Sequence, residues 1–426
     1  MNHILIMSTS NKRSHNKTKR KHKYLKGNIS RGFHSLYSSR MILRLAISLL
    51  GLFLPIFLYE VFDYHFEYVV YYYLISYFLY LVLIGWGAQY LNKIGLRRSM
   101  RISIVWGALF YFWFYLLDVM QFDNFFAHKW SILGLIGLAV ASMTVHRVMY
   151  WVPLHTDFAK FTNQSNRGKQ MSLLYSSTVF LTAVTPLVSG FILSRYNYNV
   201  LFLIAIIIYL SSLFPLMTIP KTRERFRWGY LQTWREFFSK ERRGTVLAFM
   251  GDGAENVIRI VVWPIFIWEI LNGNYLEVGA ITSLVVFATI ILQLVTGKLI
   301  DVKDKKKMLK YGTWLYAAGW IIKIFIASAF QIFIASTYHN LARIFIRTPF
   351  DALYYEKAAD QGHFVDEFTV IHEMSLMAGR ILILIVVLAL VSFVGLNWTF
   401  ILAALATLGM NFILHDDHIY HQRPAG

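Results

Sequence analysis

Long apolar stretches alternate with short polar segments along almost the whole chain. About twelve of these stretches, between Met41 and Leu414, reach the roughly 20 residues that a helix needs to cross a bilayer core. Helices suit this setting because they satisfy their own backbone polar groups. The predicted spans are Met41–Glu60, Tyr68–Tyr90, Ile102–Met120, Ser131–Val152, Met171–Leu193, Asn199–Thr218, Val246–Leu271, Val278–Leu299, Tyr311–Phe330, Ile332–Tyr355, Phe368–Val394 and Trp398–Leu414.

The second six stretches repeat polar features of the first six. Three short patterns recur about two hundred residues later. They are Ala88-x3-Asn92-Lys93-x-Gly95-x-Arg97-Arg98 as Gly297-x3-Asp301-x2-Asp304-x-Lys306-Lys307, Arg147-x5-Pro153 as Arg343-x5-Pro349, and Met171-Ser-Leu173 as Met374-Ser-Leu376. Two copies of a six-helix unit predict an all-α membrane protein whose bundles are related by an axis along the membrane normal. A cavity between the two bundles suits alternating access.

Composition excludes several classes of protein. Hydrophobic residues make up 57% of the 426 residues, which is too much apolar surface for a soluble domain. The chain has no cysteine, so disulfides, thiolate chemistry and cysteine-ligated metals are excluded. No signal-peptide hydrophobic region precedes Met41, so we expect no cleavage.

The distribution of the formal net charge of +19 predicts the topology. Lys and Arg crowd the first forty residues and then the segments after the second, fourth, sixth and eighth spans. This bias in every other segment is typical of cytoplasmic loops. Both termini are therefore expected in the cytoplasm. The predicted organisation is a disordered basic tail (1–40), a first bundle (41–219), a linker (220–244), a second bundle (245–415) and a short tail (416–426).

Two basic segments are expected to meet anionic lipid on the inner leaflet. In the tail, each Lys or Arg near the surface contributes about 1 kcal/mol. A nucleic-acid role for this tail is disfavoured, because a protein with many spans needs such charge to orient. In the linker, apolar and aromatic residues interleaved with Arg and Lys predict an amphipathic helix. They are Phe226, Trp228, Tyr230, Leu231, Trp234 and Phe237.

The segment Ala88–Arg98 resembles the loop motif between helices two and three of the major facilitator superfamily, Gly-x-Leu-Ala-Asp-Arg-x-Gly-Arg-Arg or Lys. Here Asn92 stands at the acidic position, and Lys93, Gly95, Arg97 and Arg98 match the rest. The second copy keeps Gly297, Asp301 and Lys306. Arg167-Gly168 before the fifth span is also similar to the family. The resemblance covers about Ile42 to Leu414.

The resemblance implies two six-helix bundles around a solute pathway lined by the first, fourth, seventh and tenth spans. It also implies that the loop motif acts as a cytoplasmic latch, whose acid faces a helix terminus or an Arg of the other half. Asn92 lacks that charge. The latch of this half is therefore expected to be weaker, or its acid to come from elsewhere, for instance from Asp157.

The seventh span holds the richest set of polar residues, namely Asp252, Glu255, Asn256 and Arg259. A charge at mid-bilayer costs at least a few kcal/mol, which suggests a function. Spacings of three and four place Asp252, Glu255 and Arg259 on one helix face. We interpret them as a proton-coupling site with Glu255 or Asp252 as carrier and Arg259 as partner. A permanent structural ion pair is the alternative.

Arginines at equivalent positions of the two halves suggest an anion site. Arg147 in the fourth span and Arg343 in the tenth are repeat partners. Two guanidinium groups are able to grip an anionic solute from both halves. In the alternative interpretation, both arginines lie near the cytoplasmic ends and lock the gate by pairing with Asp157, Asp351 or Glu373.

The remaining candidates for the solute cavity are Asn256, His339, Arg380, Tyr77 and Tyr80. Arg380 lies far from the ends of the eleventh span, which favours a cavity position. Tyr77 and Tyr80 lie deep enough to donate hydrogen bonds to a solute. Lys323 in the ninth span is expected to extend toward the outer surface and to be structural.

These features favour a secondary transporter of a small organic solute, anionic or zwitterionic and driven by a proton gradient. Its partners are then the solute, protons and membrane lipids, with no nucleic acid, no cofactor, no metal and a monomeric state. The expected location is a cell membrane, plasma or bacterial inner. The alternatives are a membrane-embedded enzyme acting on a lipid-linked substrate and a non-transporting sensor or scaffold on the same fold. We see no phosphate loop or nucleophile–base pair of specific spacing, so we expect no enzyme.

Overall fold

A computed structural model describes residues 31–122, 124–161, 167–221, 226–296, 304–360 and 365–415. All regular secondary structure in these ranges is helical. The first half contains α2 (Arg31–Gly51), α3 (Leu54–Val61), α4 (Phe66–Ile94), α5 (Leu96–Val119), α6 (Lys129–Phe161), α7 (Arg167–Arg195), α8 (Tyr198–Ser211) and α9 (Leu213–Met217).

The connection between the halves contains α10 (Tyr230–Phe237) and the short turn η1 (Lys240–Arg242). The second half follows with α11 (Arg243–Val257), η2 (Ile258–Val262), α12 (Trp263–Ile270), α13 (Tyr275–Thr296), α14 (Lys305–Lys323), α15 (Ala329–Asp360), α16 (Val365–Val391), η4 (Leu396–Thr399), α17 (Phe400–Gly409) and η5 (Met410–Leu414).

Length and apolarity identify eight helical segments among the described residues as long enough to cross a membrane. The number rises to nine when α2 and α3, which meet at an angle of 41°, count as one bent span. The segments α11–α12, α14 and α15 do not reach this level of apolarity and continuity. Two of them, α11–α12 and α15, carry the polar residues Asp252, Glu255, Asn256, Arg259, His339 and Arg343. The chain is therefore a multi-pass membrane protein, and polar residues lower the apolarity of these two segments.

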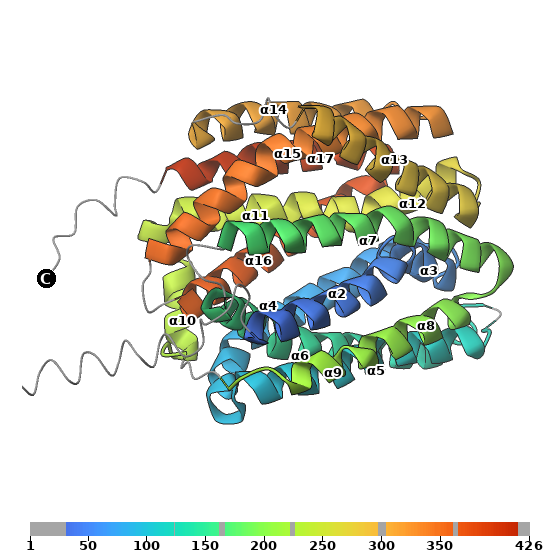
Figure 1. Ribbon diagram of the computed structural model, residues 1–426. Helices are drawn as coiled ribbons and strands as arrows, with labels where there is room; N and C mark the ends of the chain where they lie inside the picture. The colour runs from blue at the N-terminus through green and yellow to red at the C-terminus, as the bar shows by residue number, and fades with distance from the viewer. Residues whose placement is uncertain are drawn as a thin grey trace, which may run out of the picture.

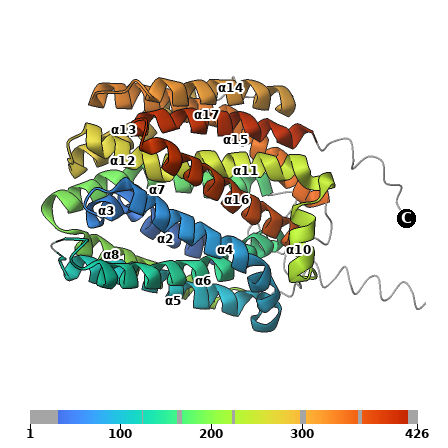
Figure 2. The same cartoon turned by 180° about the vertical axis from the view of Figure 1, so that it is seen from behind.

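The first half and the second half lie side by side (Figures 1 and 2). Across the boundary, α4 packs against α16, and α7 packs against α13. These two pairs are equivalent, because α4 of the first half corresponds to α13 of the second half, and α7 corresponds to α16. The contact between the halves thus follows the same approximate two-fold relation as the sequence patterns.

The end of the bundle away from α10 is closed by contacts between the halves. The Tyr59 hydroxyl donates a hydrogen bond to Glu269 over 2.8 Å, and the Tyr275 hydroxyl donates one to Glu60. At the α7–α13 crossing, Gly190 and Gly279 let the backbones touch, since a Cβ on Gly279 would lie 2.2 Å from the Pro186 carbonyl oxygen. Figure 1 shows this end beside α3 and α12.

The first helix begins earlier than predicted. The basic tail was expected to extend to residue 40, but α2 begins at Arg31 and buries Phe33 and Leu36. These two apolar side chains lie three apart on one helix face, so the helix continues into the basic segment. Residues 1–30 and 416–426 lie outside the described residues.

Candidate solute-binding site

The helix of the predicted seventh span is interrupted where its polar residues lie. Pro264 has no N–H group for the carbonyl of Ile260, which breaks the helical hydrogen-bond pattern. The chain passes through a π-helical turn, Ile258–Val262, between α11 and α12. Such turns are frequent at functional sites because they redirect side chains. Arg259 lies in this turn.

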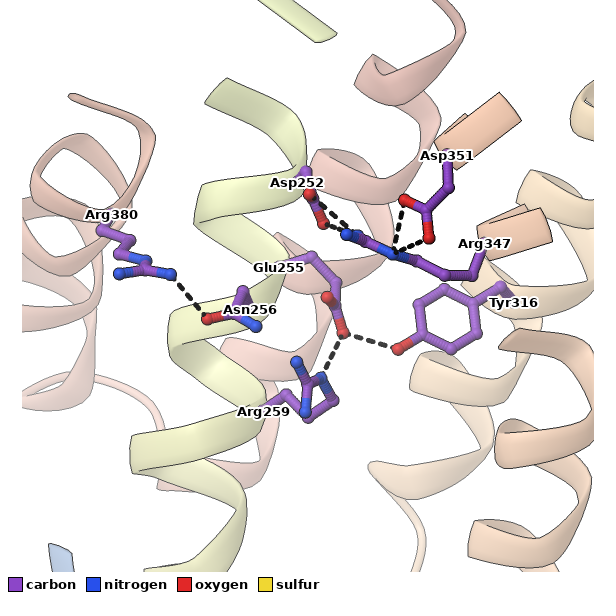
Figure 3. A network of polar contacts seen from close by, with 8 residues as sticks. All are labelled: Asp252, Glu255, Asn256, Arg259, Tyr316, Arg347, Asp351 and Arg380. Atoms are coloured by element: carbon purple, nitrogen blue, oxygen red, sulfur yellow. Dashed lines mark hydrogen bonds and ion pairs between the residues drawn. The ribbon is translucent and has the colours of Figure 1, made fainter. Parts of the chain in front are cut away.

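Glu255 lies at the centre of a small polar cluster between α11 and α14 (Figure 3). Its carboxylate accepts a hydrogen bond of 2.6 Å from the Tyr316 hydroxyl, and Arg259 Nε lies 3.5 Å from the same oxygen. The Glu255 side chain is 4% exposed and that of Arg259 is 25% exposed. The structure thus joins two of the three residues predicted to couple protons. The Arg259–Glu255 distance of 3.5 Å is longer than that of an ordinary N–H···O hydrogen bond.

Asp252 belongs to a different cluster. Arg347 Nη1 on α15 lies 2.9 Å from both carboxylate oxygens of Asp252, and Arg347 Nε lies 3.0 Å from Asp351. One guanidinium therefore holds two carboxylates, one from its own helix and one from α11 (Figure 3). Asp351, predicted as a gate residue, is bonded to Arg347. This geometry is typical of a structural lock, and it leaves Glu255 as the carboxylate of α11 with the longer ion pair, 3.5 Å against 2.9 Å.

Two arginines from opposite halves lie over one aromatic ring. Arg147 on α6 lies 5.3 Å from the centre of the Tyr77 ring, and Arg380 on α16 lies 5.0 Å from it. Neutral groups hold both, since Arg147 donates to Ser76 Oγ over 3.1 Å and Arg380 donates to Asn256 Oδ1 over 3.0 Å. Among the described residues, neither arginine is bonded to a carboxylate, although both act on the buried carboxylate of Glu373. The pair is a candidate anion site between the halves.

Arg343, predicted to act together with Arg147, lies instead beside the Glu255 cluster. Arg343 on α15 has no hydrogen bond or ion pair to another described residue, and it lies in the electrostatic field of Arg44 on α2 and of Arg259. Arg44 was not predicted as a site residue. The sequence feature that could have identified Arg44 is its position as a charged residue inside the predicted first span. The buried nitrogen Nε of Arg380 also has no hydrogen-bond partner among the described residues.

Tyr80 lies one helix turn from Tyr77 and joins the halves directly. Its hydroxyl donates a hydrogen bond of 3.3 Å to Glu373 on α16, and both side chains are buried. Glu373 therefore does not serve as a bonded partner of Arg147 or Arg343. Of the two predicted tyrosines, Tyr77 faces the arginines and Tyr80 faces an acid.

The prediction for Lys323 was wrong. It does not extend to the surface, because the residue is 3% exposed and its Nζ lies 3.8 Å from the centre of the Trp263 ring. The reason is that Trp263 on α12 and Trp320 on α14 offer the ammonium two aromatic faces inside the bundle. His339 lies beside this pocket, stacked on Tyr316 with ring centres 4.1 Å apart.

The loop motif of the first half holds the linker. Gly95 connects α4 to α5 with a φ of +83°, a left-handed conformation that favours glycine. The Asn92 side chain forms two hydrogen bonds with the backbone of Phe226, donating to its carbonyl over 2.8 Å and accepting from its N–H over 2.9 Å. An amide fits both bonds, whereas a carboxylate fits only the second.

The other motif residues make fewer contacts. Lys93 and Arg98 are exposed and Arg97 is half-buried. Lys306 lies at the start of α14, where its backbone N–H donates to Asp304. Gly297 and Asp301 lie outside the described residues. Asp157 is buried in α6.

The linker also contacts the second half. The backbone N–H of Arg227 donates a hydrogen bond of 2.8 Å to Glu367 near the start of α16, and Gln89 on α4 donates one to the Trp228 carbonyl. Trp86 on α4 stacks on Tyr230 of α10, with ring centres 4.3 Å apart. On its outer side α10 exposes Leu231, as expected of a helix on a lipid surface.

Replacing Asn92 with Asp, the residue of the family motif, is expected to loosen the linker. The carboxylate loses the bond to the Phe226 carbonyl and points an oxygen at it, at a cost of about 1–2 kcal/mol. Because the chain has no cysteine, a single spin label at Arg235→Cys on α10 reports the effect. We expect faster label motion in Asn92→Asp than in Lys93→Ala, a neighbouring exposed control. Equal spectra would contradict this account.

Across the described residues, no group of three or more His, Asp or Glu side chains is placed to hold a metal ion.

Comparisons with known proteins agree with this architecture. The family model described as Major Facilitator Superfamily matches residues 36–254. No curated protein matches the chain by sequence. Among 224 matching chains of solved structures is the crystal structure of the human organic anion transporter MFSD10 (TETRAN). It has a TM-score of 0.61 at 12% identity, and the match covers 90% of this chain and 99% of that chain. At this identity the likeness shows the fold alone.

Proposed function

Because this chain belongs to the major facilitator superfamily of membrane transporters, we propose that it carries small organic anions across a membrane by alternating access, coupled to protons. One observation carries the choice of substrate class. Arg147 and Arg380, one from each half, lie over the same Tyr77 ring and are held by neutral partners. Guanidinium groups form their strongest hydrogen bonds with carboxylates and phosphates. The structural neighbour MFSD10 is described as an organic anion transporter, and organic anions are the class proposed here.

The proposed cycle is a movement of the two halves about the shared site. In this conformation the end with Tyr59–Glu269 and Tyr275–Glu60 is closed. We propose that the full chain has twelve spans with both termini in the cytoplasm, which places this closed end at the outer side. The proposed working unit is a monomer in the plasma or inner membrane, with its basic segments on anionic lipid.

Proton coupling is proposed for the Glu255–Arg259 pair. An anion that binds Arg259 competes with Glu255 across the 3.5 Å gap. A buried carboxylate that loses its cationic partner is favoured in its protonated form. Entry of the anion thus draws in a proton, and release of the anion lets the pair form again. Asp252 is the weaker candidate because Arg347 holds both of its oxygens.

Replacing Glu255 with Gln is expected to separate transport from its driving force. The amide retains an acceptor for Tyr316 but exchanges no proton. In liposomes, accumulation driven by an inward proton gradient should fall about tenfold or more, while exchange of solute across the membrane at equal pH persists. Glu277→Gln, an exposed glutamate at the start of α13, is the matched control. Unchanged gradient-driven accumulation in Glu255→Gln would remove Glu255 from the coupling site.

The substrate class is tested by uptake into liposomes that contain the purified full chain. The probes are benzoate, succinate and glucose 6-phosphate as anions, tetraethylammonium as a cation and glucose as a neutral solute. We expect uptake of at least one anion and of neither control. Selective uptake of the cation or of the neutral solute, with no anion transported, would refute the proposal.

A further inference from the structure

Lys323 is a buried lysine without a bonded acid. It is 3% exposed, and its ammonium group lies 3.8 Å and 4.5 Å from the ring centres of Trp263 and Trp320. No hydrogen bond or ion pair joins it to another described residue. Aromatic faces stabilise a cation, but by less than the cost of removing it from water. An ammonium group in this pocket therefore lacks a counterion.

The pocket adjoins the coupling site. Tyr316, Trp320 and Lys323 lie on one face of α14, since their spacings are four and three. Tyr316 donates to Glu255, and its ring stacks on His339, whose ring also contacts Trp320 with centres 4.6 Å apart. A Cβ at Gly319 would lie 2.8 Å from the His339 ring, so the glycine allows this close approach.

The charges that act on Lys323 come from α11, η2 and α15. They are the carboxylate of Glu255 and the cations Arg259 and Arg343. His339 on α15 acts on the same pocket, and its Nε2 is buried without a hydrogen-bond partner among the described residues. On α17 the pocket meets the apolar ring of Phe400. Glu255 is therefore the one carboxylate in this set, and in this conformation it is engaged with Tyr316 and Arg259.

We propose that Lys323 is a second proton-binding site of the transporter, which gains a proton when an anion displaces Glu255 from Arg259. This proposal rests on the proposed function. Before the anion binds, Glu255 is paired with Arg259 and the Lys323 amine is uncharged. After the anion binds, the one proton that enters from solvent forms an N–H bond on Lys323 in place of an O–H bond on Glu255, and the ammonium replaces Arg259 as the countercharge of the Glu255 carboxylate. One negative charge and one proton enter together.

The transport test uses Lys323→Arg, in which the positive charge is permanent. We expect proton-gradient-driven accumulation of the transported panel anion (benzoate, succinate or glucose 6-phosphate) to fall about tenfold, while its exchange at equal pH persists. Lys310→Arg, an exposed lysine on the same helix, should behave as wild type. A folded Lys323→Arg protein with the wild-type proton-to-anion ratio would overturn the proposal, because a structural lysine leaves this ratio unchanged.

A second readout needs no solute and so stays informative if the proposed function fails. Lys323 Nζ contacts two indole rings, so gain or loss of its proton changes tryptophan emission. We expect a pH-dependent emission step in wild type that is absent in Lys323→Met and Lys323→Arg and present in Lys310→Arg. Identical pH profiles in wild type and Lys323→Met would overturn the proposal. If the emission step is observed but no panel anion is taken up, Lys323 remains a proton-binding site and only the proposed substrate class is refuted.

Discussion

Replacing Arg147 or Arg380 with Ala is expected to lower uptake of the transported anion about a hundredfold. Each change removes one guanidinium from the pair over Tyr77, and a hydrogen bond to a charged group contributes about 1.5–3 kcal/mol. The loss should appear mainly in binding of the anion, because the Ser76 and Asn256 partners left behind are neutral. The measurement is initial uptake rate against anion concentration in liposomes.

The matched control for this experiment is Arg195→Ala, an exposed arginine at the end of α7. It removes the same charge from the same protein but lies far from Tyr77. Because the two site arginines come from different halves, both single variants should be impaired to a similar degree. Wild-type uptake in a folded Arg147→Ala or Arg380→Ala protein would show that the pair does not bind the solute.

Replacing Arg347 with Ala is expected to produce the largest loss of stability. The change leaves Asp252, whose side chain is 9% exposed, without its cation, and it also frees Asp351. Removing one partner of a buried ion pair costs about 3–5 kcal/mol, and the lower end applies because Arg347 is 34% exposed. Thermal unfolding of the purified protein in detergent measures the effect.

Neutralising the acid as well should restore part of the stability. In the double variant Asp252→Asn with Arg347→Ala, no buried carboxylate is left unpaired, so its melting temperature should exceed that of Arg347→Ala alone. An Arg347→Ala variant with the melting temperature of wild type would contradict the lock described here. So would a double variant that is no better than the single one.

The local part of the site could be predicted from the sequence. Glu255 and Arg259 are four residues apart, and helical periodicity is enough to bring them together. The apolar stretches likewise predicted helices, and the loop patterns of the first and second halves predicted the family. Within one helix, spacing determines which side chains share a face.

Contacts between helices could not be predicted in the same way, because they depend on how one helix is rotated and shifted against another. Arg380 was a candidate, but its place with Arg147 over Tyr77 follows from the packing of α4 against α16. Asp252 was assigned to Arg259 on spacing alone, whereas the structure bonds it to Arg347 on another helix. Lys323 was placed at the surface because Trp263, the nearer of its two aromatic contacts, is distant in sequence.

Simultaneous measurement of anion and proton entry tests the central claim most directly. Liposomes containing the full chain and an internal pH-sensitive dye receive radiolabelled benzoate, succinate or glucose 6-phosphate from outside. We predict that at least one anion enters together with internal acidification, and that both signals fall together in Arg380→Ala. Entry of an anion with no acidification would contradict proton coupling. Absence of entry for every anion in folded wild-type protein would contradict organic anion transport itself.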